Sequence, residues 1–289
     1  MSVYDLMIEA GKHQLNLQPN EVAGILLGSK VTKLGPHEAA RIREFALAHA
    51  DEIEHLIPSE ARPNECSLIG MLAGYLPHDP GLAKLLQFGF GCVDAEQPEG
   101  QYGRGAFNYA RRCSASGSFG DHSFDFAQDC SADGYFGLSS FARARRCRAK
   151  GTFEALSFIG AADCMVSGEF GKYDRGSYSN IFGGNMMVFG ESLAEFALNG
   201  PCIILYKTGK MDEVYSQSKL STPGVAPGED EAIIMGIGYD GDNSHVARVL
   251  AEDVPPMDAT DDNFPYQVIG LVRIYFGKAP AWAEQLAGV

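Results

Sequence analysis

Between residues 96 and 180 the sequence repeats with a period of 17 residues. Cysteine, glycine, two aromatic residues and alanine each recur at fixed offsets. The cysteine column is Cys113, Cys130, Cys147 and Cys164. The glycine column is Gly100, Gly117, Gly134, Gly151 and Gly168. The aromatic columns are Tyr102, Phe119, Phe136, Phe153 and Phe170, then Phe107, Phe124, Phe141 and Phe158. The alanine column is Ala110, Ala127, Ala144 and Ala161. In the unit that begins at Glu96, we interpret the glutamate as standing in the place of the cysteine.

A period of 17 residues is too short for a helix-turn-helix repeat and fits one coil of a parallel β-solenoid. Apolar or small residues alternate with polar ones along Cys130–Phe136, which predicts a strand with cysteine, alanine and phenylalanine pointing inward. Stacked coils lie about 4.8 Å apart, so each column becomes a ladder of like side chains. Glycines at 103, 120, 137 and 171 are expected at the corners of the coils.

The last column of the repeat alternates in charge, which predicts ion pairs between neighbouring coils. Its members are Arg112, Asp129, Arg146, Asp163 and Asn180. The fifth unit departs from the pattern after Phe170, and an insertion of about three residues would restore it at Ser177 and Tyr178.

These units resemble parallel β-helix (β-solenoid) repeat proteins in general. The segment Gly184–Gly190 is also similar to one repeat of the GXGXG β-helix of glutamate synthase and of formylmethanofuran dehydrogenase subunits. The Cys-x-Ala-x-Gly-x-Phe units depart from the glycine spacing of that family. Pentapeptide-repeat mimics of DNA are likewise acidic solenoids, but 17 is not a multiple of their period. The expected fold is therefore mainly β, a parallel β-solenoid of 17-residue coils, with right-handed coils expected from strand twist.

Three regions are predicted: a helical cap over 1–91, the solenoid over 92–206, and an α+β or β region over 207–289. Apolar spacing predicts a helix over 36–57, and a short helix follows from Asp79 to Leu86. Beyond the repeats, apolar runs predict strands at 201–206, 232–239 and 268–276. Long polar loops are expected at 216–231 and 240–265.

The net charge of -14 disfavours nucleic acid as a partner. Residues 207–289 carry 6 basic and 13 acidic residues, a net charge of -7, so half of the excess lies there. The sequence contains no apolar run of membrane-spanning length and no secretory signal at its start, so we expect a cytoplasmic protein without membrane contact. Seven cysteines without CxxC pairs predict buried, reduced thiols rather than a disulfide framework or a zinc ribbon.

Two groups of polar residues are candidate sites, and no metal site or cofactor is predicted. Asp240, Asp242 and His245 form one, which could supply oxygen ligands to calcium or a catalytic group, although a polar turn is the favoured interpretation. The other is a basic cluster that could bind an anionic ligand or partner, or pair with Asp129 and Asp163. Its members are Arg143, Arg145, Arg146, Arg148 and Lys150. The adjacent Asp121, His122 and Ser123 are interpreted as a turn, because a catalytic triad is a spatial arrangement.

The leading hypothesis is a non-catalytic β-solenoid that binds or organises another macromolecule, or that self-associates as a homo-oligomer. A protein partner is therefore expected. One alternative is an enzyme or enzyme subunit whose site lies where the C-terminal loops pack on the solenoid. Another is a phage or surface structural protein that assembles end to end. We favour the non-catalytic hypothesis, because the repeats predict a flat-sided ladder between caps and the sequence offers no convergent set of catalytic residues.

Overall fold

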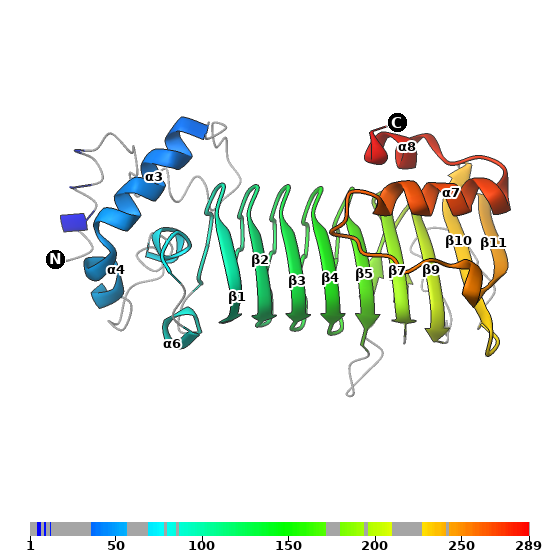
Figure 1. The fold of residues 1–289 in the computed structure, drawn as a ribbon, viewed down its shortest axis with the longest axis horizontal. Coiled ribbons are helices and arrows are strands. Elements are labelled where there is room, and N and C mark those ends of the chain that lie inside the picture. Colours follow the sequence, from blue (N-terminus) through cyan, green and yellow to red (C-terminus); the bar gives the residue numbers. More distant parts are fainter. Residues whose placement is uncertain are drawn as a thin grey trace. The chain divides into compact units, whose positions relative to one another are not determined.

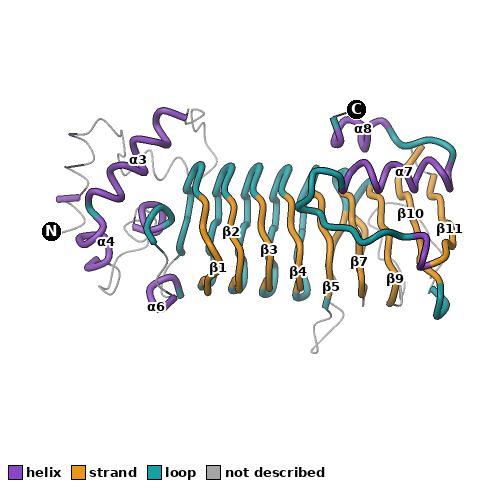
Figure 2. Tube along the Cα trace, in the orientation of Figure 1, coloured by secondary structure: helices purple, strands orange, loops and turns teal. Residues whose placement is uncertain are grey.

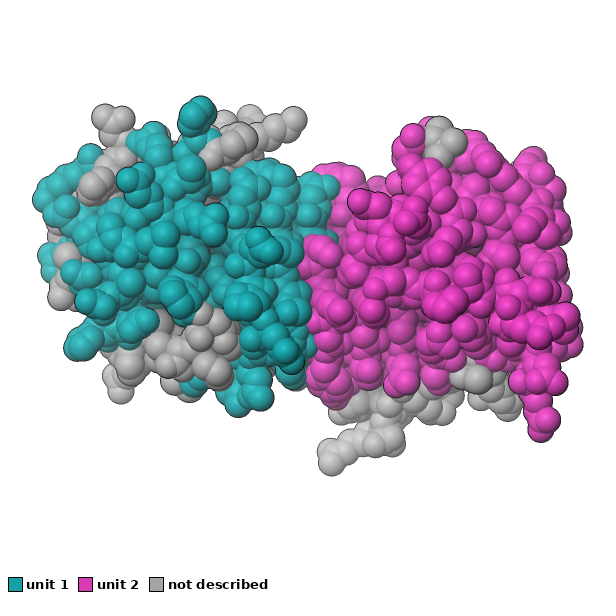
Figure 3. Space-filling view, viewed as in Figure 1, with its two compact units in different colours: residues 1–130 teal, residues 131–289 magenta. Residues whose placement is uncertain are grey.

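Parallel strands stack as a β-solenoid of about six turns, with coils of about 17 residues between residues 96 and 206. This computed structural model describes residues 5, 6, 9, 12, 36–56, 69–77, 80–84, 87–171, 180–193, 196–209, 227–240 and 243–288. The chain divides into two compact units, residues 1–130 and 131–289 (Figure 3). The expected β-solenoid with helices in the N-terminal region is confirmed. The boundaries at 91 and 206 stay a prediction.

The first unit combines helices with the first strands of the solenoid (Figure 1). Its elements are α3 (Pro36–Ala48), α4 (Ala50–Leu56), α6 (Pro80–Ala83), β1 (Glu96–Tyr102) and β2 (Ser114–Phe119). The helix expected over 36–57 forms with a turn at His49, and the one expected from Asp79 is described over α6. Strands β1 and β2 are parallel.

The second unit holds the remaining strands and two helices near the C-terminus. The strands of its main sheet, in spatial order, are β3 (Ser131–Phe136), β4 (Arg148–Phe153), β5 (Met165–Phe170), β7 (Met186–Leu193), β9 (Cys202–Gly209), β10 (Glu231–Asp240) and β11 (Asn243–Leu250). Its other elements are β6 (Asn180–Phe182), β8 (Phe196–Leu198), η1 (Ala251–Asp253), α7 (Phe264–Phe276) and α8 (Ala281–Ala287). Strands β3 to β9 of the main sheet are parallel, whereas β10 is antiparallel to both β9 and β11.

The glycine column aligns across the strands as predicted. Gly134 pairs with Gly151, and Gly151 pairs with Gly168. Gly151 has a φ of 140°, which side chains of L-residues rarely adopt. A Cβ atom on Gly151 would lie 1.7 Å from the carbonyl oxygen of Gly134, and one on Gly168 would lie 1.9 Å from that of Gly151. Glycine is therefore required wherever one coil's backbone passes over the next at this column.

The two aromatic columns form the interior of the coils. Phe136 and Phe153 stack with ring centroids 4.7 Å apart, and Phe153 and Phe170 with centroids 5.1 Å apart. In the first unit, Tyr102 stacks on Phe119 with centroids 4.9 Å apart. Burial of such large rings, together with their ladder geometry, is the main favourable contribution that the repeat makes to folding.

The second aromatic column lies on the return arc between strands and adopts left-handed backbone conformations. Its φ values lie between 56° and 69° for Phe107, Phe124, Phe141 and Phe158. Hydrogen bonds to both neighbouring coils hold this arc. Ser139 donates its N–H to Ala155 in the following coil, and Phe158 donates to Ser140 in the preceding coil. A left-handed phenylalanine costs about 1–2 kcal/mol, which these bonds and the ring's burial offset.

The first coil differs from the predicted alignment. Glu96 does not stand in the cysteine column, because it is exposed and pairs with Ser114. A register shift between Gln97 and Glu99 inserts one residue at Pro98, which has no N–H for the ladder. The cysteine position therefore falls to Ala95, whose carbonyl accepts from the N–H of Ser114.

The charge column also differs from the prediction at both of its ends. It begins one coil earlier, where Asp94 accepts two hydrogen bonds from Arg112, at 2.6 and 3.0 Å. At its other end Asn185 replaces the predicted Asn180 and donates to Asp163 at 3.2 Å. Asn180 instead lies in β6, fully buried, and its side chain bonds Ser157 and Gly171. The expected insertion near Ser177 lies outside the described residues.

In the C-terminal region, one predicted strand is wrong and one strand was not predicted. The strand expected at 268–276 is the helix α7, whose apolar residues face the sheet, and the loop expected over 240–265 contains β11. A run rich in valine and isoleucine favours a strand locally, but here the packing of the run on an apolar sheet face determines a helix. The strand expected at 232–239 is confirmed as β10.

We predict that Gly151→Ala lowers the free energy of unfolding by roughly 3 kcal/mol or more, because the new methyl group meets backbone and the φ is unfavourable. Gly270→Ala in α7 is the control, since no atom lies within 4 Å of a Cβ there, and it should leave stability equal or slightly higher. Urea unfolding followed by circular dichroism measures both. Equal midpoints for the two variants would contradict the glycine argument.

Candidate functional site

The outer face of the sheet changes character within the second unit. On β3 and β4 it carries polar side chains, among them Asp133 and Lys150. From β5 onward it carries buried apolar side chains that pack against α7 and the segment before it. They include Met165, Met187, Phe189, Ile203 and Leu205. Figure 2 shows α7 lying across strands of this part of the sheet. The central strands under α7, β7 and β9, are therefore buried on both faces.

Residues 254–263, here called the C-terminal strap, connect η1 to α7 and bind the basic side chains of β4. Lys150 Nζ lies 2.7 Å from Asp258 Oδ2, and Arg148 donates to Asp262 at 2.6 Å. On β5, Ser167 accepts the N–H of Ala259 at 2.9 Å, and both residues are buried. Arg148 and Lys150 of the predicted basic cluster thus form ion pairs within the chain. Their partners, Asp262 and Asp258, lie in the segment that was expected to be a polar loop.

The Lys150–Asp258 pair is the better enclosed of the two. Burial opposes ionisation of Asp258, but hydrogen bonds from Lys150 and Thr260 outweigh it and hold the pKa of Asp258 below its usual value. The hydrogen bond to Asp258 also raises the pKa of Lys150. The side chain of Asp262, by contrast, is 95% exposed, so its bond to Arg148 is weakened by solvent.

The other three arginines of the cluster lie on the return arc between β3 and β4. All of them are exposed: Arg143, Arg145 and Arg146. The arc fixes their backbone, because Arg143 and Arg146 have positive φ values of 56° and 51° and donate their N–H groups to Ile159 and Ala162 in the following coil. The structure therefore divides the basic cluster into a pair held by the strap and a group of arginines on the arc, here called the arginine arc.

The second candidate site lies around the β10–β11 connection. Asp240 ends β10 and pairs through its backbone with Asn243, while Asp242 lies outside the described residues. The ring of His245 is 5.5 Å from that of Phe276, at the end of α7. A role of these three residues in catalysis or calcium binding stays a prediction.

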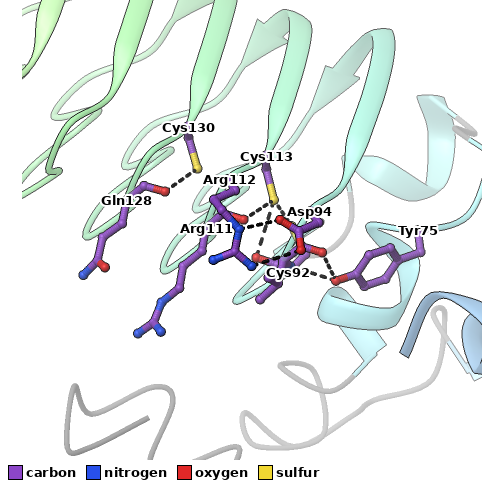
Figure 4. A network of polar contacts seen from close by, with 9 residues as sticks. Tyr75, Cys92, Asp94, Arg111, Arg112, Cys113, Gln128 and Cys130 are labelled. Atoms are coloured by element: carbon purple, nitrogen blue, oxygen red, sulfur yellow. Dashed lines mark hydrogen bonds and ion pairs between the residues drawn. The ribbon is translucent and has the colours of Figure 1, made fainter. Parts of the chain in front are cut away.

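The cysteines form part of a polar network on the inner side of the first coils (Figure 4). The sulfur atoms of Cys92 and Cys113 lie 3.2 Å apart, and Cys113 and Cys130 donate to the backbone carbonyls of Arg111 and Gln128. All six described cysteines are free and buried, and burial raises the pKa of Cys92. They fill the interior as small residues, as predicted. Within the described part of the chain, no three potential ligands converge on a metal position.

Comparisons with known proteins give no relative: no family model, curated protein or solved structure matches the chain. Among the described residues, none of the helices has the length and apolar character needed to cross a bilayer.

We predict that Asp258→Asn loosens the strap, raising amide hydrogen exchange in 254–263 by roughly two- to fivefold near neutral pH. Because the pKa of Asp258 is lowered in the fold, its ion pair stabilises above the usual carboxyl pKa and is lost as the pH falls through the lowered value. The amide exchange rates of the variant and the wild type should therefore become equal in acid. Asp262→Asn, at the exposed pair, should change exchange less. A larger effect at Asp262 would contradict this account.

Proposed function

We propose that the protein is a non-catalytic β-solenoid that acts as a binding or scaffold protein, and that it engages an acidic surface of a protein partner through the arginine arc. The observation that carries this proposal is the binding of the acidic strap to Arg148 and Lys150. In these two ion pairs, basic side chains next to the arc bind carboxylates. On the arc, Arg145 is exposed and offers the same chemistry at the surface.

The rigid arc supports this function. Side chains on a backbone held by bonds to neighbouring coils lose little backbone entropy when a partner binds. Arginine also pairs with carboxylates through two parallel hydrogen bonds, as Arg112 does with Asp94 in the first unit. The net charge of -14 would repel an acidic partner at long range, but salt screens that repulsion beyond about 8 Å. Binding would therefore depend on the local arrangement of the arginines.

Site-specific photo-cross-linking in cells tests the proposal, with the photoreactive residue at position 145. Position 169 is the control, because Glu169 is exposed on β5, away from the arc in sequence. We expect a protein adduct at 145 that is absent at 169. With the purified adduct partner, Arg145→Ala should weaken binding about tenfold, and added salt should weaken it further. The absence of a position-specific adduct, or equal binding by Arg145→Ala, would contradict the proposal.

A further inference from the structure

Strand β11 ends the main sheet, and its outer edge is open in the part of the chain that the structure describes. Ala251 donates its N–H to Asp230, and β11 pairs with β10 in antiparallel register, Glu231 with Leu250 and Ile233 with Arg248. In an antiparallel ladder the bonded residues alternate along each strand. The N–H and C=O groups of Val246, Arg248 and Leu250 therefore point away from β10, toward this edge.

The side chains of Val246 and Leu250 lie on the same face of the sheet as the apolar interior of the solenoid. Val246 pairs with Met235, and Met235 is fully buried in the interior. On β11, however, Val246 is 37% exposed and Leu250 is 51% exposed. Open hydrogen-bonding groups beside exposed apolar side chains are the features that a pairing strand recognises.

Charge does not protect this edge. Natural edge strands are commonly guarded by an unpaired charged side chain. The charged side chain of β11 is Arg248, and its guanidinium donates to the carboxylate of Glu231 on the adjacent strand. That ion pair partly offsets the charge of the arginine, so a second strand meets little repulsion unless Arg248 faces the same residue of the other copy.

The edge of the first coils, in contrast, is closed by the chain itself. The hydroxyl of Tyr75 donates to the carbonyl of Val93 and accepts the N–H of Val93. The amide of Gln97 donates to Gly74 and Leu76, and Gly103 donates to Ala83. The backbone that flanks β1, at Val93 and Gly103, and the side chain of Gln97 are thus bonded to the helical region. With the β1 edge capped by these contacts and the β11 edge open among the described residues, two copies can pair without growing into a fibre.

We infer that β11 pairs with β11 of a second copy of this chain, antiparallel and about a twofold axis, to form a closed dimer. A register centred on Ala247 pairs Ser244–Leu250 of the two copies and sets Arg248 opposite Val246 of the second copy. A register centred on Arg248 would instead oppose two like charges, which is destabilising. The favoured register brings Ala247 of each chain together at a position without hydrogen bonds, where backbones approach to about 4.5 Å and small side chains fit.

Sedimentation velocity on the full-length chain tests the inference, with the expected result being twice the mass of the monomer. Val246→Lys should raise the dissociation constant at least about tenfold, because it places a charge in the paired edge. Tyr266→Lys is the matched control: Tyr266 is 51% exposed on the first turn of α7, and the variant should remain dimeric. Circular dichroism of both variants confirms that they are folded.

A second variant tests the register independently of mass. Ala247→Cys should form a disulfide-linked dimer under mild oxidation, whereas Tyr266→Cys should not. A monomeric wild type, an open-ended oligomer, a monomer that carries a bound foreign peptide, or a dimer unaffected by Val246→Lys would each overturn the inference. Loss of the dimer in Tyr266→Lys would overturn the assignment to β11. Because this edge contains no residue of the arginine arc, a monomer would leave the proposed partner binding standing.

Discussion

The close approach of backbones at the glycine column is the constraint on which the other features of the solenoid depend. Gly134, Gly151 and Gly168 bring successive coils so near that a single methyl group would overlap a carbonyl oxygen. With the coils held at this spacing and register, phenylalanines stack directly on phenylalanines. The left-handed arc residues, the cysteines and the charge column then find their partners one coil away. Each ladder is therefore a consequence of a register that the glycines permit.

The second unit shows how a repeating structure gains distinct surfaces. The interior changes little from coil to coil, but the outer face is exposed to solvent on some coils and covered by other segments of the chain on others. Where Met165, Met187 and Phe189 point outward, α7 covers the sheet, and where Arg148 and Lys150 point outward, the acidic strap binds them. Two surfaces that the described residues leave exposed are the arginine arc and the edge of β11, for which we propose a binding function and a dimer.

Much of the interior could be predicted from the sequence, because inward columns must repeat with the coil. The limits of the repeat could not, since a single bulge at Pro98 moves the first coil by one residue, and Asn185 takes the position expected for Asn180. The helix α7 was predicted as a strand because its local composition favours one. The apolar outward residues of β5 and β7 were the available signal that something covers them. The division of the basic cluster could not be predicted either, because Asp258 lies 108 residues from Lys150 in the chain.

The central claim is that each coil is an interchangeable unit whose length sets the register of every ladder. The most direct measurement is the urea midpoint of a chain in which Ser131–Cys147 is duplicated in tandem, beside one in which the duplicated segment lacks one residue. Since side chains alternate along a strand, the full duplication should keep a cooperative transition with a midpoint at or above that of the wild type. The chain whose duplicated segment lacks one residue should lose the cooperative transition. If both duplications unfold alike, the account is contradicted.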